Sequence, residues 1–335
     1  MASVDVAVPC YQYGHYLRDC LTSILNQGIR DLRVVVIDNA STDDTLKVAR
    51  EFAAADRRVG IIAHPVNLGQ HASFNEAIDW AEADYFMLLC ADDALAPGSL
   101  SRALAVLEKH PEVHLTYGQE LEMSDGPIPP VQQPTQCASY RVVPGRELLE
   151  CLCRAGRSFF GAQSVVVRTS VQKQVGHYRS ELVHTDDFEM WMRFACVGSV
   201  AEIHAVQGLK RAHPLNRCAT VHNVHMWDLH YEAAFESFFA KEGVSVDGAR
   251  RLRRIARRAL SERAYWGSVA SLLRGDARLS FDLLRFALTR NPISVVVPPL
   301  GYLFRRRDAF QKIAQVFSEA VVGIAAPVKE GRLGQ

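Results

Sequence analysis

The sequence predicts an α/β fold in which a mostly parallel central sheet is flanked by helices and followed by a helical C-terminal extension. Strand-like and helix-like segments alternate through the first half of the 335-residue chain, the pattern of parallel strands joined by covering helices. The strands are short apolar runs such as residues 34–37, and beyond about residue 219 the pattern is nearly all helical. We therefore expect an α/β domain over residues 1–218 and a helical, basic region over residues 219–335.

Each predicted strand is an apolar run that ends at a breaker or a polar residue. The first run stops at Pro9, which cannot extend a sheet interior, and the second ends at Asp38. We expect strands over residues 4–8, 34–37, 59–63, 85–90, 113–117, 164–167 and 200–206.

The predicted helices carry apolar residues at helical spacing. Leu17 and Leu21 fall on one face, and residues 41–44 resemble a capping box that opens a helix through Val48 and Phe52. Further helices are expected over residues 70–82, 98–110, 145–154 and 188–196. Loops are expected over residues 123–135 and 210–218.

Composition and charge fit a globular protein and exclude some partners. Hydrophobic residues make up 48% and charged residues 22% of the chain, and the net charge of +1 argues against a general nucleic-acid binder. No apolar run approaches the length that spans a bilayer. The eight cysteines form no C-x-x-C pair and no signal peptide is evident, so we expect a reducing, cytoplasmic location.

Basic residues gather late in the chain. Arginines crowd residues 250–258, and three more at 305–307 follow the apolar stretch 293–304. Most charge runs are solvated faces. The junction of an apolar stretch with cations also suits an anionic membrane surface, so we expect peripheral membrane contact at the inner face of the membrane.

Four polar clusters follow successive predicted strands. They are residues 9–11, residues 38–41, residues 67–69, and the pair Asp92 and Asp93. Each cluster alone is commonly a turn or a helix cap. Four in chain order would converge on one crevice outside the carboxyl ends of the strands, where α/β sheets bind ligands. The paired carboxylates suit Mg²⁺ or Mn²⁺ shared with substrate phosphates, and capping of the next helix is the alternative.

The order of these motifs resembles the family 2 glycosyltransferases, which have the GT-A fold. The resemblance covers roughly residues 3–215. It is carried by five segments: VPCYQ at 8–12, VIDNASTDDT at 36–45, NLG at 67–69 with Asn75, LCADDALAP at 89–97, and TDDFEMWMR at 185–193.

The resemblance implies a role for each matching residue. Asp187 is the expected general base, with helix capping as the alternative reading. Asp92 and Asp93 are the expected ligands of a divalent metal, Mn²⁺ or Mg²⁺. The expected nucleotide-sugar site consists of Pro9, Tyr11, Asp38, Asn67, Gly69, Asn75, Asp92 and His213.

Two positions leave alternatives open. Cys90 stands where the family often has Asp. A cysteine at this position would weaken the binding of the nucleotide or the metal. The resemblance implies that His213 faces the diphosphate of the donor. The equal alternative is that His213 lies in a solvated basic loop and contacts no ligand.

The implied activity is sugar transfer, with inversion, from a nucleotide-diphospho-sugar to a hydroxyl of a glycan or lipid-linked acceptor in polysaccharide biosynthesis. A degenerate protein of the same fold that binds nucleotide or glycan without turnover is one alternative, supported by Cys90. A nucleotidyltransferase fits less well, because the loop 9–15 that follows the first strand has one glycine and no cation to hold a triphosphate.

Overall fold

The computed structural model describes residues 2–131, 138–295 and 297–305, which form two compact units. The first unit consists of residues 2–152, 157–220 and 234–249. The second consists of residues 153–156 and 221–233 and the described residues from 250 onward. The division into domains after residue 218 stays a prediction. Arg306 and Arg307 of the predicted membrane segment lie outside the described residues.

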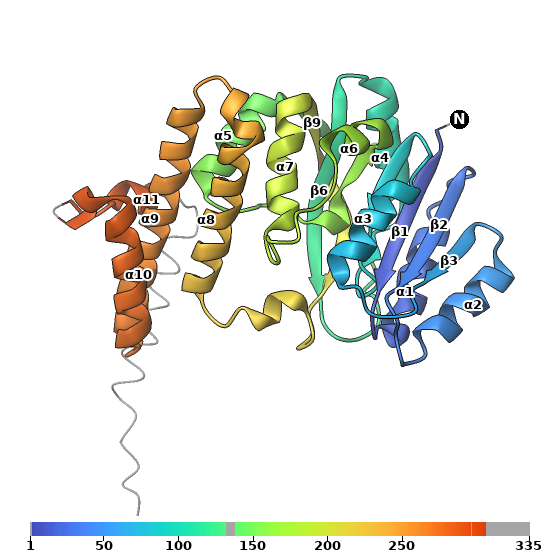
Figure 1. The fold of residues 1–335 in the computed structure, drawn as a ribbon. Coiled ribbons are helices and arrows are strands. Elements are labelled where there is room, and N and C mark those ends of the chain that lie inside the picture. Colours follow the sequence, from blue (N-terminus) through green and yellow to red (C-terminus); the bar gives the residue numbers. More distant parts are fainter. Residues whose placement is uncertain (1, 132–137, 296, 306–335) are drawn as a thin grey trace, which may run out of the picture. The chain divides into compact units, whose positions relative to one another are not determined.

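A single nine-stranded sheet forms the centre of the first unit (Figure 1). The strands lie in the order β3 (Val59–Ala63), β2 (Leu32–Asp38), β1 (Val4–Cys10), β4 (Tyr85–Leu88), β8 (Val166–Arg168), β6 (Val113–Met123), β9 (Ser199–Arg211) and β5 (Ala94–Leu95), and β7 (Tyr140–Val143) also pairs with β9. Neighbours from β3 to β4 are parallel. Because β8 is antiparallel to both β4 and β6, and β9 is parallel to β6, the two long strands run in the direction of β4. The predicted mostly parallel sheet is confirmed.

Helices cover both faces of this sheet. Side chains of α1 (Gly14–Leu25), α2 (Thr45–Ala55) and α4 (Ser99–Lys109) share one hydrophobic core with alternate residues of β1 and β2. On the other face, α3 (Gln70–Trp80), α6 (Thr169–Val175) and α7 (Asp186–Val197) pack against strands and against one another. All seven residues of β1 are buried, as expected for a parallel strand covered on both sides.

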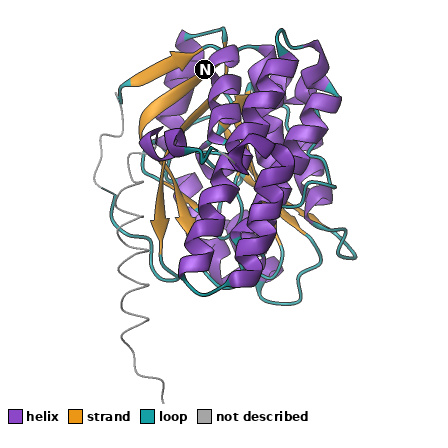
Figure 2. Ribbon diagram, turned by 90° about the vertical axis from the view of Figure 1, so that its left-hand side faces the viewer, coloured by secondary structure: helices purple, strands orange, loops and turns teal. Residues whose placement is uncertain are grey.

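The rest of the described chain is largely helical, and Figure 2 distinguishes these helices from the strands. The longer helices are α5 (Gly145–Ala155), α8 (Val224–Ala240), α9 (Ala249–Leu273), α10 (Ala277–Arg290) and α11 (Leu300–Arg305). Short 3₁₀ turns are η1 (Ala162–Ser164), η2 (Arg217–Thr220), η3 (Glu242–Ser245) and η4 (Pro292–Val295). No helix in the described part of the chain combines the length and the apolar character needed to cross a membrane. The predicted C-terminal helices are present.

Several sequence predictions need correction. The strand predicted over residues 200–206 continues through Arg211 as β9, so the predicted loop 210–218 begins inside a strand. The strand expected over residues 85–90 ends at Leu88, and β5, β7 and α6 were not predicted. These three elements are short, and their stability comes from pairing or packing with distant segments rather than from a local pattern.

One buried carboxylate fixes β1 against the turn that leads into β4. Asp5 is fully buried and accepts hydrogen bonds from Arg33 Nε and Nη2 at 2.7 Å each. It also accepts from the backbone N–H groups of Glu82 at 2.7 Å and Ala83 at 2.9 Å. Burial alone would raise the pKa of Asp5, but these hydrogen bonds hold the pKa below its ordinary value. Asp5 therefore connects β1 both to β2 and to the turn before β4.

We expect Asp5→Ala to lower the free energy of unfolding by about 3 kcal/mol, because it leaves Arg33 and the N–H groups of Glu82 and Ala83 without their acceptor. Urea denaturation at neutral pH measures the loss. Glu108→Ala, at an exposed position of α4, is the control and should change stability by less than about 0.5 kcal/mol. Because the pKa is lowered in the folded state, the contribution of Asp5 disappears as the pH falls below about 4. Equal stability of the two variants would contradict the assignment.

Candidate active site

The carboxyl ends of the parallel strands bring the predicted site residues to one edge of the sheet. The segments after β1, β2, β3 and β4 all begin at this edge. Because β9 runs in the same direction, the segment after Arg211 reaches it as well. The chain also reverses its strand order here, since β2 and β4 lie on opposite sides of β1 (Figure 1). Such a switch point is where open α/β sheets bind ligands.

The loops after β1 and β2 are joined by a set of short hydrogen bonds. Gln12 N–H donates to Ser41 Oγ at 3.0 Å, and Gln12 Oε1 accepts from the backbone N–H groups of Thr42 and Asp43 at 3.2 Å each. Gln12 and Ala40 both have a φ of 61°, which non-glycine residues rarely adopt. Backbone strain of this kind persists where the surroundings enforce it, commonly at functional sites.

The capping box predicted at residues 41–44 does not form. The helix α2 begins at Thr45, and the hydroxyl of Ser41 accepts from Gln12 instead. Asp43 accepts from the N–H of Gly14 at 2.9 Å and from the N–H of Thr45 at 3.0 Å, so it joins two loops. Although burial opposes the shift, these hydrogen bonds lower the pKa of Asp43. The prediction was wrong because the local pattern could not show the partner loop.

The residues predicted to hold a nucleotide base differ in exposure. Asp38 is buried at the end of β2, where its Oδ1 accepts from the N–H of Ser41 at 3.2 Å. Pro9 is buried at the end of β1, and the following Tyr11 exposes 44% of its surface. The buried carboxylate and the exposed ring therefore stand at the ends of adjacent parallel strands.

The turn before α3 is organised by an asparagine that the sequence did not single out. Asn39 Nδ2 donates to Asn67 Oδ1 at 2.9 Å, and Asn39 Oδ1 accepts from the N–H of Leu68 at 2.8 Å. Gly69 follows with a φ of 82° and a ψ of 158°, a conformation essentially limited to glycine. Asn75 lies farther along α3, where it exchanges hydrogen bonds with the backbone of Tyr178 at 2.8 and 3.2 Å. Its amide joins α3 to the segment before α7.

Asp92 is bound by two side chains from the segment after β9. Its Oδ2 lies 3.1 Å from His213 Nε2 and accepts from Asn216 Nδ2 at 3.0 Å. Both Asp92 and His213 are buried. The neighbouring Asp93 accepts from the N–H of Arg211 at 3.0 Å, while burial and the charge of Asp92 raise the pKa of Asp93 well above its ordinary value. Asp92 and Asp93 therefore have different surroundings.

The guanidinium group of Arg211 stabilises the loop that carries Asp92 and Asp93. Arg211 is 2% exposed and donates to the carbonyl of Asp92 at 3.1 Å, to Asp19 at 3.1 Å and to the carbonyl of Gly126. Its guanidinium carbon lies 4.8 Å from the centroid of the Tyr16 ring. Arg211 thus fixes the end of β9 against the Asp92 loop.

A second carboxylate pair lies at the start of α7. Asp186 is 1% exposed and accepts from both Nη atoms of Arg217 at 3.0 and 3.3 Å, and from His71 Nε2 at 3.0 Å. Asp187 accepts from the N–H of Phe188 at 2.6 Å. Burial and then the charge of Asp186 raise the pKa of Asp187 to about 7, against the opposing charge of Arg217.

The segment 213–217 links the two carboxylate pairs. His213 and Asn216 contact Asp92, and the next residue, Arg217, pairs with Asp186. The sequence pointed to His213 only, since Asn216, Arg217 and His71 carry no local signal of their own. The roles of Asn216 and Arg217 follow from the direction of β9, and the role of His71 follows from its contact with Asp186 across the fold. The sequence alone showed neither.

Cys90 is a neutral thiol in this setting. Burial, followed by the charges of Asp92 and Asp93, raises its pKa well above the ordinary value. The cysteine therefore adds no negative charge beside the two carboxylates at neutral pH.

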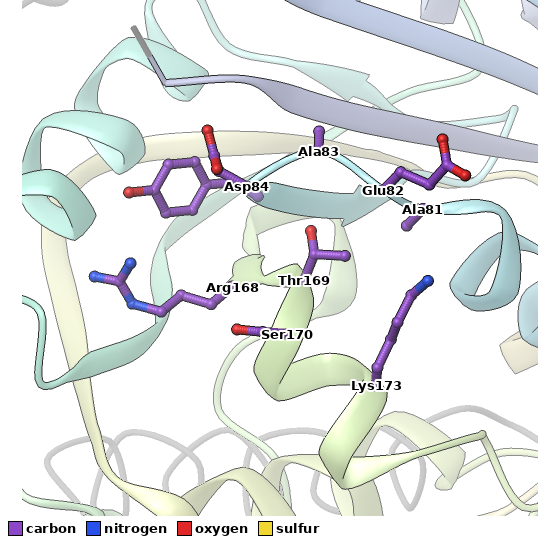
Figure 3. Close-up of a pocket in the computed structure, with 9 residues that line it drawn as sticks. Ala81, Glu82, Ala83, Asp84, Arg168, Thr169, Ser170 and Lys173 are labelled. Carbon is purple, nitrogen blue, oxygen red and sulfur yellow. The ribbon is translucent and has the colours of Figure 1, made fainter.

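A hollow of about 450 Å³ lies at the opposite end of β4 (Figure 3). It is lined by residues 81–85 at the start of that strand and by Arg168, Thr169, Ser170 and Lys173. Since β4 runs away from it, this hollow is separate from the edge that carries Asp92.

Comparison with known proteins finds similarity to one family in the first part of the chain. Residues 5–131 match the model of glycosyl transferase family 2. An uncharacterized glycosyltransferase of Haemophilus influenzae is 34% identical over 121 residues, which cover 36% of this chain and 37% of the relative. The chain therefore spans less than half the length of that curated relative.

Two solved structures share the fold. Residues 1–349 of TarS from S. aureus, in complex with UDP-GlcNAc, superpose with a TM-score of 0.54 at 15% identity, covering 87% of this chain and 91% of that one. The mannosyltransferase PcManGT from Pyrobaculum calidifontis, in complex with GDP-Man and Mn²⁺, superposes with a TM-score of 0.55 at 16% identity, covering 98% of this chain and 88% of that one. Residues 5–131 therefore match glycosyl transferase family 2, the family that the motifs predicted, and the chain shares the GT-A fold that the resemblance implied.

Proposed function

We propose that this chain transfers a sugar from a nucleotide-diphospho-sugar to a hydroxyl group of a glycan or lipid-linked acceptor, with inversion, in polysaccharide biosynthesis. The proposal is carried by one segment, residues 213–217, that contacts two carboxylate pairs. His213 contacts Asp92, and Arg217 pairs with Asp186, the neighbour of Asp187. Asp92 is buried beside His213, whereas Asp187 has a raised pKa and no ion pair among the described residues. A direct displacement at a sugar carbon needs one group for the leaving diphosphate and another for the attacking hydroxyl.

We assign donor binding to the loops after β1, β2 and β3. The carboxylate of Asp38 accepts from the nucleotide base, and Pro9 with the exposed ring of Tyr11 forms the wall of that pocket. Asn67 and Gly69 shape the turn beside it. The ligands of the two solved relatives, UDP-GlcNAc and GDP-Man, support this class of donor.

We place a divalent cation, Mn²⁺ or Mg²⁺, beside Asp92. Asp92 Oδ2 and His213 Nε2 lie 3.1 Å apart, close enough for both atoms to bind one ion, and a carboxylate with an imidazole suits Mn²⁺. The described residues hold no group of three His, Cys, Asp or Glu side chains suited to a metal, and such ions commonly take their other ligands from phosphates and water. Asp93 is the second candidate ligand, although it already accepts from Arg211. When bound, the cation supplies positive charge that stabilises the leaving diphosphate.

Asp187 acts as the general base. It accepts the proton of the acceptor hydroxyl while the hydroxyl oxygen bonds to the anomeric carbon and the bond from that carbon to the diphosphate breaks. One displacement from the face opposite the leaving group inverts the configuration. A carboxylate with a pKa of about 7 is a stronger base than an ordinary aspartate, and about half of it is ionised at neutral pH.

Arg217 and Asp186 position this base. Their ion pair at 3.0 Å keeps a positive charge near Asp187 and fixes the start of α7 against the segment after β9. His71 from α3 completes the surroundings of Asp186.

We place the reaction in the cytoplasm, at the inner face of the membrane, with peripheral contact through the C-terminal region. The thiols of Cys10, Cys20 and Cys90 are reduced, which suits a reducing compartment. The exposed apolar side chains of Ile293, Val297 and Leu300 support contact with lipid.

We expect a nucleotide sugar with Mn²⁺ to raise the midpoint of thermal unfolding, because a ligand of the native state stabilises it by mass action. A screen of UDP-, GDP-, dTDP- and CMP-sugars, each with and without Mn²⁺, measures the shift. Asp92→Asn should abolish the metal-dependent part, while Glu108→Gln should leave it unchanged. If no donor class shifts the midpoint of the folded wild-type protein, the chain is not a donor-binding transferase.

We expect Asp187→Asn to reduce turnover by about 10²–10⁴-fold, because an amide accepts no proton from the acceptor hydroxyl. The donor-induced thermal shift should persist in this variant. In the wild-type protein the rate should rise with pH through about 7, as Asp187 loses its proton. Normal turnover by Asp187→Asn would show that another group is the base.

We expect the neighbours of Asp187 to move this pH dependence in opposite directions. Arg217→Gln removes a positive charge, so the rising limb of the pH profile should move to higher pH. Asp186→Asn removes a negative charge and should move the limb to lower pH. A shift in the same direction in both variants would contradict the electrostatic assignment, whatever their effect on the maximal rate.

A further inference from the structure

A groove lined by arginines lies at the start of α9 in the second unit. Its volume is about 740 Å³. Five residues of α9 and four from the end of α10 and the following turn line it: Arg250, Arg253, Arg254, Arg257, Arg258, Thr289, Arg290, Asn291 and Pro292. No sequence motif of the transferase site includes this groove.

Helical spacing places the five α9 arginines on one face. Their separations of three and four residues repeat with the turn of an α-helix. All five are exposed. The opposite face of the same turns is buried and carries Leu252, Ala256, Ala259 and Leu260. The arginine face is therefore directed away from the core of its own unit.

This arrangement of charge is unfavourable without a partner. Like charges three and four residues apart repel, and cations at the beginning of a helix oppose its dipole. Arg258 pairs with Glu262 at 2.7 Å and Arg290 with Glu232, but among the described residues Arg254 and Arg257 form no ion pair. Residues 249–290 hold eleven arginines and three carboxylates in a chain whose net charge is +1. The groove thus concentrates positive charge, and at Arg254 and Arg257 no ion pair with a described residue compensates it.

Exposed apolar side chains follow the groove directly. The chain leaves Pro292 at its rim and continues with Ile293, which is 70% exposed, Val297, which is 61% exposed, and Leu300, which is 55% exposed. Large aliphatic side chains in water beside a cationic groove match the layout of a surface that lies in a bilayer interface. A soluble polyanion would explain the arginines but not these aliphatic residues.

We propose that this groove docks on the anionic surface of a lipid bilayer. The guanidinium groups contact lipid phosphates, and Ile293, Val297 and Leu300 enter the boundary between headgroups and acyl chains. This role rests on the proposed function, in which the chain works beside a membrane. It assigns the membrane contact to the arginines of α9 rather than to the basic residues 305–307. It needs no step of sugar transfer.

Co-sedimentation of the full chain with vesicles tests the proposal. The wild-type protein should pellet with phosphatidylcholine vesicles that contain about 30% phosphatidylglycerol and should stay in solution with phosphatidylcholine alone. Arg254→Gln/Arg257→Gln should weaken binding about 25-fold, since each cation near such a surface strengthens binding about fivefold. The control pair, Arg278→Gln/Arg285→Gln, removes the same charge from exposed positions of α10 outside the groove and should change binding less than about threefold.

Further variants separate a bilayer from other anions. Ile293→Ser/Val297→Ser should weaken vesicle binding but leave binding of an RNA oligonucleotide or inorganic phosphate unchanged. Equal losses in the two arginine pairs, or wild-type protein that binds RNA and no vesicle, would overturn the proposal. The donor-induced thermal shift, measured on the same variants, should equal that of the wild type. A failure of membrane docking is therefore distinct from a failure of the transferase assignment.

Discussion

The candidate site depends on the fixed end of β9, where the buried guanidinium of Arg211 contacts the Asp92 loop. The segment 213–217 follows directly from this end and contacts both carboxylate pairs. The guanidinium donates three hydrogen bonds to three separate parts of the chain: the carbonyl of Asp92, the carbonyl of Gly126 and the carboxylate of Asp19. A buried arginine with this many partners is costly to remove, because its acceptors would remain buried without a donor.

From this fixed end, one short segment gives neighbouring carboxylates different properties. Asp92 has an imidazole and an amide beside it, which suits a group that shares a cation with phosphates. Asp186 forms an ion pair with Arg217, whereas Asp187 forms none among the described residues. Burial and the charge of Asp186 therefore raise the pKa of Asp187. Separation of acid–base character between adjacent carboxylates is how one site performs two tasks at the same pH.

The sequence predicted the elements that depend on local pattern and missed those that depend on distant partners. The strand over residues 59–63 and the carboxylates Asp92 and Asp187 follow from apolar runs and motif order. Asn216 and Arg217 could not be predicted, because their importance comes from the direction of β9 and from contacts more than thirty residues away in sequence. The capping box predicted at Ser41 was wrong for the same reason. The hydroxyl of Ser41 accepts from the N–H of Gln12 in another loop rather than from its own helix.

Charge is distributed over the chain in a way that the total of +1 hides. Carboxylates gather at the sheet edge of the first unit, where they are paired, hydrogen-bonded or raised in pKa. Arginines gather on α9 of the second unit, and those at 254 and 257 have no carboxylate partner among the described residues. In the functions proposed above, the acidic groups act on a bound donor, and the cations of α9 bind an extended anionic surface. The two units therefore meet different physical requirements, and neither set of residues explains the presence of the other.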